Sequence, residues 1–485
     1  MNQGGVPKRT RVLMLLGTSL VTDARVRKSA KSISDAGYAV TLVWCHPMAT
    51  KPAPIEIEGV EVIAVPFNSY LQKHRAKLRA INPAANPRRG PKLGYKNAQD
   101  RRIAAQRLSA REARRYVQPK GRRGLFLAQQ IHRLRSVALT RREKSLVNRQ
   151  AKRFSREDWR ETLCHIADQE VALDPVLRQI KADIVHVHDV YPLGAGVEYK
   201  LRQADHGQRV ALIYDAHEFV AGQARADESL AAAYATMERE YAGYVDGFVA
   251  VSEPSAKAIQ KELNLSRRPT VVINSQPEVP MEPKEGWATL RELTGLDESV
   301  PLIAYVGGMG HRRCLEEVIK AMVQLEDAHL AMVCVPSTRH RYAKVLMQLT
   351  KQLELEDRVH FFDPVPPEQV CHLVTGCTVG LNPLQPHLLN HELTLPNKVF
   401  EYASAGVPVA ASRTGELGRV VTEYGLGETF DPAPDSIAQA IQTIMSNHWV
   451  YVNATRNPAF IQEFSWEKQV ANLVALYQAV APKAG

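Results

Sequence analysis

Residues 11–44 read RVLMLLGTSLVTDARVRKSAKSISDAGYAVTLVW, and this stretch decides the fold class. The apolar run at its start predicts a buried strand that ends at a turn near Gly17. A helix is expected from Asp23 to Gly37, where the glycine suits the residue after the last turn. The apolar residues that follow predict a second strand. A strand, a helix and a strand in so short a stretch indicate a parallel βαβ unit.

The same alternation continues along the chain in two series. The first series has further predicted strands at residues 60–65, 184–188, 211–215, 247–252 and 270–273. A segment rich in proline and acidic residues, 274–286, then predicts a linker. The second series has predicted strands at 301–306, 329–335, 359–362, 379–382 and 407–412. We expect two doubly wound α/β domains that enclose a ligand cleft between the carboxyl ends of their strands.

The composition is that of a globular protein. The chain has 485 residues, of which 45% are hydrophobic, and this excludes a wholly disordered or coiled-coil chain. No apolar run approaches the roughly 18 residues needed to span a bilayer, and the N-terminus does not read as a signal peptide. The six cysteines are scattered without a Cys-x-x-Cys pair, so neither a disulfide framework nor a zinc site is indicated. We expect a cytoplasmic protein.

The positive charge is concentrated in one segment. Residues 69–161 hold 27 Lys or Arg against 6 Asp or Glu, whereas the rest of the chain holds 35 against 45. This segment, with a helical stripe at Leu127, Ile131, Leu134 and Ala138, predicts a basic amphipathic insert. It has few aromatic residues for stacking on bases, so an anionic membrane surface is the expected partner rather than nucleic acid. A solvated charged face, or packing on the domain, is the alternative.

A second diagnostic stretch, LPNKVFEYASAGVPVAAS at residues 395–412, indicates a ligand site. Pro396 suits the first helical position and Gly406 suits the helix stop. Lys398 lies in the first turn, where a bound diphosphate would offset the unfavourable helix dipole. Glu401 lies on the same face, at the depth where a ribose would follow the phosphate. An ordinary solvated Lys–Glu pair is the alternative interpretation.

This stretch resembles the donor-binding helix of the group 1 retaining glycosyltransferases, which have the two-domain GT-B fold, and in particular their PNKxxEY subset. The resemblance places Leu395, Asn397, Lys398 and Glu401 in the binding site of a nucleotide-sugar donor, expected to be a UDP- or GDP-sugar. Glu401 matches the second Glu of the family's paired motif. Leu393 stands where the first Glu belongs, and Glu392, one position out of register, receives no role.

Other segments extend the resemblance. Residues 304–321, AYVGGMGHRRCLEEVIKA, resemble the first turn of the family's donor domain, with Gly308 in place of the usual Arg and Arg313 at a cationic position. An ordinary tight turn is the alternative. Residues 363–370 resemble the loop that reads the base, and 464–477 resemble the last helix, which crosses back to the first domain.

In the first domain, DIVHVHD at 183–189 and IYDAHE at 213–218 end two predicted strands with histidines. The resemblance implies that His188 lies nearest the reacting sugar, flanked by His217 and Glu218. For His186 a buried structural role is the main alternative, and His186, His188 and Asp189 also raise the possibility of zinc.

The loop at residues 17–27 resembles the family's first loop, which faces the donor phosphate and the acceptor. Asp23 is then expected to accept an acceptor hydroxyl and Arg25 to meet a phosphate. A helix N-cap at Asp23 and a solvated helix face are the alternative interpretations.

These observations predict an acceptor-side domain at 1–273 with the insert at 69–161, a donor domain at 274–465, and a returning helix at 466–485. The implied activity is transfer of a sugar, with retention, in glycan or polysaccharide synthesis, without a cofactor or metal. The implied acceptor is lipid-linked or a glycan, at the inner face of the membrane. A basic nucleic-acid-binding protein and a GT-B sugar-nucleotide epimerase remain as alternatives.

Overall fold

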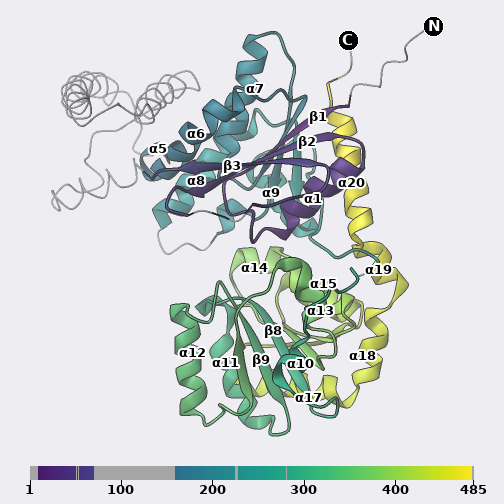
Figure 1. The fold of residues 1–485 in the computed structure, drawn as a ribbon. Helices are drawn as coiled ribbons and strands as arrows, with labels where there is room; N and C mark the ends of the chain where they lie inside the picture. The colour runs from purple at the N-terminus through teal and green to yellow at the C-terminus, as the bar shows by residue number, and fades with distance from the viewer. Residues whose placement is uncertain are drawn as a thin grey trace, which may run out of the picture.

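A computed structural model describes residues 9–50, 52, 54–69, 159–223, 228–279 and 281–482. The basic segment predicted at 69–161, with its apolar stripe, therefore lies almost wholly outside the described residues. The described chain forms two α/β domains, with the C-terminal helix running back along the first (Figure 1). None of the helices in these residues is both long and apolar enough to cross a membrane.

The N-terminal domain is built on a seven-stranded parallel sheet with the order β3-β2-β1-β4-β5-β6-β7. Its strands are β1 Arg11–Leu16, β2 Ala39–Pro47, β3 Val60–Phe67, β4 Ile184–His188, β5 Ala211–Ala216, β6 Gly247–Ala250 and β7 Thr270–Val271. Its helices are α1 Ala24–Asp35, α5 Trp159–Thr162, α6 Cys164–Leu177, α7 Leu193–Asp205, α8 Glu228–Ala242 and α9 Glu253–Glu262, with the short turn η1 Val220–Gly222.

The C-terminal domain has a six-stranded parallel sheet with the order β10-β9-β8-β11-β12-β13. Its strands are β8 Leu302–Gly308, β9 His329–Val335, β10 Val359–Phe362, β11 Val379–Asn382, β12 Val409–Ser412 and β13 Gly427–Phe430. Its helices are α10 Leu290–Thr294, α11 Leu315–Ala321, α12 Arg341–Gln352, α13 Val370–Leu373, α14 Leu389–Leu393, α15 Asn397–Ser404, α16 Gly415–Glu423, α17 Pro434–Ser446, α18 His448–Thr455 and α19 Pro458–Phe464, with η2 His311–Arg313, η3 Met322–Gln324 and η4 Pro367–Gln369.

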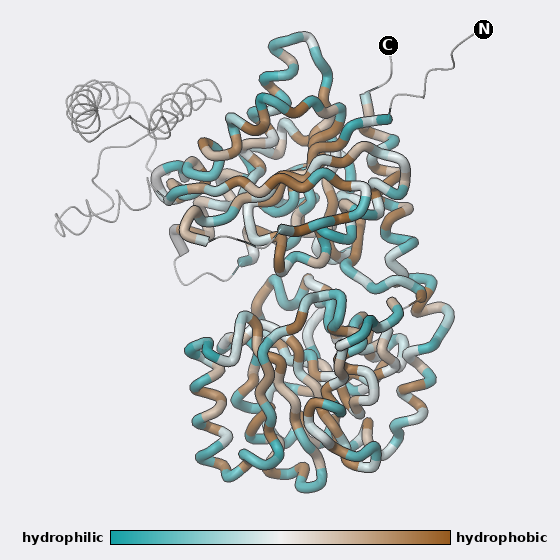
Figure 2. The backbone as a smooth tube through the Cα atoms, in the orientation of Figure 1, coloured by the Kyte–Doolittle hydropathy of each residue, from teal (hydrophilic) through white to brown (hydrophobic). Residues whose placement is uncertain are grey.

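Helices cover both faces of each sheet, which explains the continuous apolar runs in the strands. In β1, Leu13 and Leu15 pack into the core on one face, while Met14 and Leu16 pack into the core on the other. Figure 2 shows the hydrophobic strands in the middle of each domain and more hydrophilic segments outside. This is the doubly wound arrangement that the sequence predicted.

Two connections join the domains. The chain leaves β7 through residues 272–289, and it returns through α20, Trp466–Val480. Trp466, Leu473 and Tyr477 of α20 belong to the N-terminal core, on the same sheet face as α1. The strand order reverses between β1 and β4 and between β8 and β11. Because ligands bind at such reversals, outside the carboxyl ends of the strands, both domains direct their sites toward the space between them.

Candidate active site

A cleft of about 1410 Å³ lies between the two domains. Its walls include eight of the nine residues predicted for the site: Asp23, His217, Gly308, Arg313, Leu395, Asn397, Lys398 and Glu401. The ninth, His188, is fully buried and does not line the cleft. It was expected to lie nearest the reacting sugar, but strand β4 turns its side chain into the domain interior, and His217 reaches the cleft instead.

The donor-side wall is centred on the start of α15. The helix begins at Asn397, one residue later than predicted, because Pro396 keeps an extended backbone (φ −67°, ψ 145°) and occupies the N-cap. No side chain caps this end, and Pro396, Asn397 and Lys398 all line the cleft. Gly406 follows the helix in a left-handed conformation (φ 71°), the role predicted for it.

Lys398 and Glu401 lie one turn apart on this helix and face the same cleft. Burial and, to a smaller extent, Arg313 together lower the pKa of Lys398 to about 7, against the opposing effect of Glu401. Burial also raises the pKa of Glu401, against the effect of Lys398 and Lys28. Both pKa values are thus shifted toward the neutral forms, so binding of a charged ligand would change the ionisation of Lys398 and Glu401.

The two glycines at the end of β8 differ in their surroundings. A Cβ atom on Gly307 would lie 2.6 Å from Cε of Lys398, so the lysine passes directly over this backbone. A Cβ atom on Gly308 would meet nothing within 4 Å. Gly307 therefore makes room for Lys398 itself, while Gly308 leaves open space beside it in the cleft.

The far end of the donor wall is formed by two short loops. Val335 ends β9 and Pro336 begins the first loop, and residues 364–367 come from the second loop, after β10. Thr338 ties them together, since its N–H and its hydroxyl each donate to Oδ1 of Asp363 at 2.8 Å. These valines and prolines give the cleft a largely apolar part, called the apolar slot below, in the same domain as α15.

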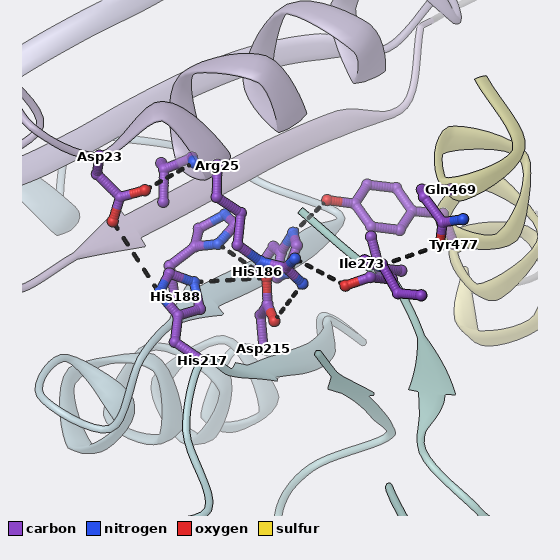
Figure 3. A network of polar contacts seen from close by, with 11 residues as sticks. Asp23, Arg25, His186, His188, Asp215, His217, Ile273, Gln469 and Tyr477 are labelled. Atoms are coloured by element: carbon purple, nitrogen blue, oxygen red, sulfur yellow. Dashed lines mark hydrogen bonds and ion pairs between the residues drawn. The ribbon is translucent and has the colours of Figure 1, made fainter. Parts of the chain in front are cut away.

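A buried ion pair anchors the N-terminal wall (Figure 3). Nε and Nη2 of Arg25 donate to the two carboxylate oxygens of Asp215 at 2.8 Å each, and Nη1 donates to the carbonyl of Val272 at 2.7 Å. The sequence suggested a phosphate contact or a solvated face for Arg25, but the side chain is 5% exposed and its guanidinium is used internally. Burial would raise the pKa of Asp215, yet Arg25 and the neighbouring histidines hold it well below its usual range.

His217 joins this pair to the cleft. Its Nε2 lies 3.5 Å from Oδ2 of Asp215, and its Nδ1 lies 4.0 Å from Oδ2 of Asp23. Burial alone would lower the pKa of His217, but the two carboxylates raise it above its ordinary value. Asp23 has two roles, because it also accepts the N–H of Val26 at 3.0 Å and so caps α1.

The remaining histidines lie behind this wall. Nδ1 of His188 is 3.3 Å from Oδ2 of Asp215, and burial lowers the pKa of His188. Nδ1 of His186 lies 2.7 Å from the hydroxyl of Tyr477 on α20. Buried neutral histidines here fix the orientation of the strand ends that carry the cleft residues.

Metal ligation has a geometric basis among these residues. Candidate ligand atoms of His186, His188 and Asp215 lie within 4.8 Å of one another. Asp189, the carboxylate that the sequence suggested, instead accepts the N–H of Val190 at 2.6 Å. Both oxygens of Asp215 already accept from Arg25, so a cation at this triad would share the carboxylate with a guanidinium of the same charge.

Glu392 has a structural position in the described chain. Its carboxylate accepts the N–H of Gly415 at 2.7 Å and the N–H of His387 at 3.2 Å. It thereby fastens the start of α16 to the loop before α14, and it does not line the cleft.

Sequence reasoning missed the contacts that join the two walls, although it had named Glu218 as a cleft residue. Nη1 of Arg27 lies 3.4 Å from Oε2 of Glu368, across the cleft. Nδ2 of Asn390 lies 3.4 Å from Oε2 of Glu218, also between the domains. Only the charged run at 25–28 signalled that this face of α1 had polar partners.

Two family models match the chain. Residues 288–458 match the model described as glycosyl transferases group 1, and residues 122–275 match the model described as Glycosyltransferase Family 4. The first match includes Arg313, Lys398 and Glu401, and the second includes His188 and His217.

Curated relatives are similar over part of the chain. A D-inositol 3-phosphate glycosyltransferase of Geodermatophilus obscurus is 26% identical over 318 residues, covering 62% of this chain and 67% of that protein. One of Corynebacterium glutamicum is 25% identical over 195 residues, covering 39% and 45%. The chain thus spans about two thirds of the first relative and less than half of the second.

Solved structures share the whole architecture. Sucrose-phosphate synthase of Thermosynechococcus elongatus has a TM-score of 0.62 at 14% identity, covering 97% of this chain and 99% of that chain. HepE of Anabaena in complex with UDP-glucose has a TM-score of 0.60 at 12% identity, covering 97% and 100%. With the family models, these likenesses confirm the predicted GT-B fold.

Proposed function

The chain is a glycosyltransferase with the GT-B fold whose domains match the group 1 and Family 4 models, and we propose that it transfers a sugar from a nucleotide-sugar, with UDP as the favoured nucleotide, to an acceptor hydroxyl. The observation that carries the proposal is that Lys398 and Glu401 both line the cleft from the uncapped first turns of α15. The UDP-glucose complex of HepE, a protein of the same fold, supports the choice of nucleotide.

The donor-side residues suit a departing nucleoside diphosphate. Lys398, Arg313 and the first N–H groups of α15 place positive charge around one point of the cleft, where negative charge develops as the sugar leaves. Glu401 accepts hydrogen bonds from the two ribose hydroxyls, and the base binds in the apolar slot at 364–367. Protein cations then perform the task that a divalent metal performs elsewhere.

The acceptor-side residues suit a hydroxyl that approaches from the N-terminal domain. Asp23 accepts a hydrogen bond from the hydroxyl group that receives the sugar. His217, held between Asp215 and Asp23, donates a hydrogen bond to the sugar or to the departing phosphate. His188 acts through Asp215 rather than by touching the sugar. Transfer proceeds with retention, and catalysis rests on positioning and on stabilisation of the leaving group.

The donor class is tested by incubating the full chain with UDP-, GDP- and ADP-sugars and analysing the products by mass spectrometry. Slow release of UDP from a UDP-sugar, above the rate without protein, is the expected result. Release of another nucleotide would correct the base, and absence of both nucleotide binding and hydrolysis would overturn the proposal.

The affinity for UDP is expected to fall as the pH rises above about 7, the pKa of Lys398 before a nucleotide binds. A bound diphosphate favours the charged ammonium, so the pKa of Lys398 rises in the complex and binding takes up a proton. Between the pKa of Lys398 in the free protein and its higher pKa in the complex, the affinity for UDP therefore falls by up to about tenfold for each pH unit. Above the higher pKa the affinity no longer changes with pH through this group. Calorimetric titration from pH 6 to pH 9 measures the effect. A flat profile in this range would contradict the assignment of Lys398.

We further propose that the acceptor is lipid-linked or a glycan, in polysaccharide synthesis, and that the protein binds the inner surface of the membrane. The support is the charge of residues 69–161, with 27 Lys or Arg against 6 Asp or Glu. Each such cation near an anionic surface contributes about 1 kcal/mol. Co-sedimentation with anionic vesicles is therefore expected at low salt and is weakened by high salt. Equal recovery with neutral and anionic vesicles would contradict this proposal.

A further inference from the structure

Helix α14, Leu389–Leu393, lies on the side of the C-terminal domain that faces the N-terminal domain (Figure 1). A Cβ atom on Gly222, the last residue of η1, would lie 3.1 Å from Cδ2 of Leu389, so the glycine allows the helix to approach this closely. The hydroxyl of Ser252, the N-cap of α9, donates to the carbonyl of Leu393. Helix α14 therefore contacts the N-terminal domain at both of its ends.

Between these two contacts, Asn390 of α14 meets Glu218 of the N-terminal domain. Nδ2 of Asn390 lies 3.4 Å from Oε2 of Glu218, and Nε2 of Gln223 donates to the same oxygen at 2.5 Å. All three residues line the cleft, and Glu218 is exposed there. The second carboxylate oxygen, Oε1, receives no hydrogen bond from the residues that the structure describes. Since a carboxylate oxygen accepts from hydroxyl groups, Oε1 is available to a bound ligand.

Glu218 differs from the other carboxylates that line the cleft in the described part of the chain, which are Asp23, Glu368 and Glu401. Asp23 caps α1, and Glu368 pairs with Arg27. Glu401 is assigned to the ribose. The donors that the described residues offer to Glu218 are neutral amides, so its charge is not paired with a cation among them. Hydroxyl groups of a ligand can form charge-assisted hydrogen bonds with such a carboxylate.

The contact between α14 and Glu218 lies next to the site assigned to the diphosphate. Residues 394–396 connect α14 to α15, and three residues span about 10 Å at most. Lys398 follows in the first turn of α15. On the N-terminal side, Glu218 directly follows His217, which is assigned to the sugar or the departing phosphate. A sugar bonded to a diphosphate at Lys398 is therefore expected in the same part of the cleft as Glu218.

We propose that Glu218, held by Asn390 and Gln223, binds hydroxyl groups of the transferred sugar and so determines which nucleotide-sugar the protein uses. This inference rests on the proposed function. The two amides fix one carboxylate oxygen, and the other oxygen accepts from the sugar. A site built to hydrogen-bond a substrate hydroxyl discriminates strongly against an analogue that lacks it. Because Asn390 comes from the other domain, the complete site exists only where the two domains meet.

The test measures hydrolysis of the donor that the protein prefers among UDP-glucose, UDP-galactose and UDP-N-acetylglucosamine, and of the monodeoxy analogues of that donor. The preference is the kcat/KM of the parent donor divided by that of each analogue. Water is the acceptor in this reaction, so the preference reports contacts of the transferred sugar. Glu218→Gln keeps the shape of the side chain and removes its charge. We expect the preference over the analogue that lacks the bound hydroxyl to fall about tenfold, while the affinity for UDP changes less than about twofold.

Two further variants separate sugar recognition from a contact that merely joins the domains. Asn390→Ala removes one of the two amides that hold the carboxylate, so it should lower the same preference by a smaller factor. Glu368→Gln is the matched control, since Glu368 also contacts the other domain, through Arg27 at 3.4 Å. Glu368 directly follows the apolar slot in the chain. Every sugar preference should therefore survive in this control, whatever happens to the overall rate.

The possible failures can be told apart. If the unmodified protein neither binds nor hydrolyses a UDP-sugar, the proposed function fails. If it hydrolyses them but Glu218→Gln keeps every preference, or weakens UDP and all donors equally, Glu218 only joins the domains and the present inference is overturned. If the preference changes only during transfer to a glycan acceptor, the hydroxyl groups belong to the acceptor, and the assignment to the transferred sugar is wrong.

Discussion

Lys398→Ala is expected to lower sugar transfer about a hundredfold, and Glu401→Ala by a similar factor, because each change removes a charge-assisted contact of about 1.5–3 kcal/mol. The two side chains lie one turn apart at the start of α15 and face the cleft together. Lys398 passes directly over Gly307, which has no side chain of its own to take the place of the ammonium. The loss should appear both in turnover and in the affinity for UDP.

The measurement is the initial rate of transfer, or of donor hydrolysis, with calorimetry of UDP binding on the same samples. Lys320→Ala provides the control, since Lys320 lies in the same domain and pairs with Glu317 at 3.1 Å on the surface. Full activity in both site variants would end the assignment of α15 as the donor helix.

The sequence predicted the sheets well because their strands are buried on both faces. Five strands, β1, β4, β9, β10 and β11, have the predicted bounds, and each is a short, mostly apolar run. The predicted list lacked β13, which has only four residues, begins with Gly427 and includes Glu428. A glycine is needed there because a Cβ atom would lie 2.0 Å from the carbonyl oxygen of Val409 on the neighbouring strand. Because the backbones of β12 and β13 approach so closely, β13 needs a glycine, and its short polar sequence resembles that of a loop.

The candidate site was predicted where it depends on one local segment, and less completely where it depends on distant pairs. Lys398 and Glu401 are neighbours on a single helix, so their spacing alone brings them together. Arg25 and Asp215 are separated by 190 residues, and only the folded sheet brings their side chains within 2.8 Å. The burial of His188 has the same origin, because a histidine that ends a strand can face the cleft or the core, and the pattern of residues 184–188 fits both.

Arg25→Met is expected to lower the free energy of unfolding by about 3–5 kcal/mol, the usual cost of removing one partner from a buried ion pair. Methionine retains most of the volume, but it leaves Asp215 as a buried carboxylate with only His188 and His217 near it. The carbonyl of Val272 loses its donor as well.

Arg27→Met is the control, since Arg27 is partly exposed and pairs with Glu368 at 3.4 Å. Such pairs contribute about 0–1 kcal/mol. Denaturant unfolding followed by circular dichroism measures both variants.

The pH dependence of this loss identifies its cause. In the unmodified protein, Arg25 and the histidines hold the pKa of Asp215 well below its usual range, so the pair stabilises the fold at neutral pH. Without Arg25, burial raises this pKa above the unfolded value of about 3.9, so the ionised carboxylate destabilises the variant above that value. The deficit should therefore be largest near pH 7 and shrink as the pH falls toward 4, where the carboxyl group of Asp215 becomes neutral in the variant. Arg25→Met combined with Asp215→Leu should recover part of the stability, because no buried charge is then left unpaired. A deficit that stays constant between pH 5 and pH 8, and that the double variant does not reduce, would show that Arg25 contributes packing rather than charge.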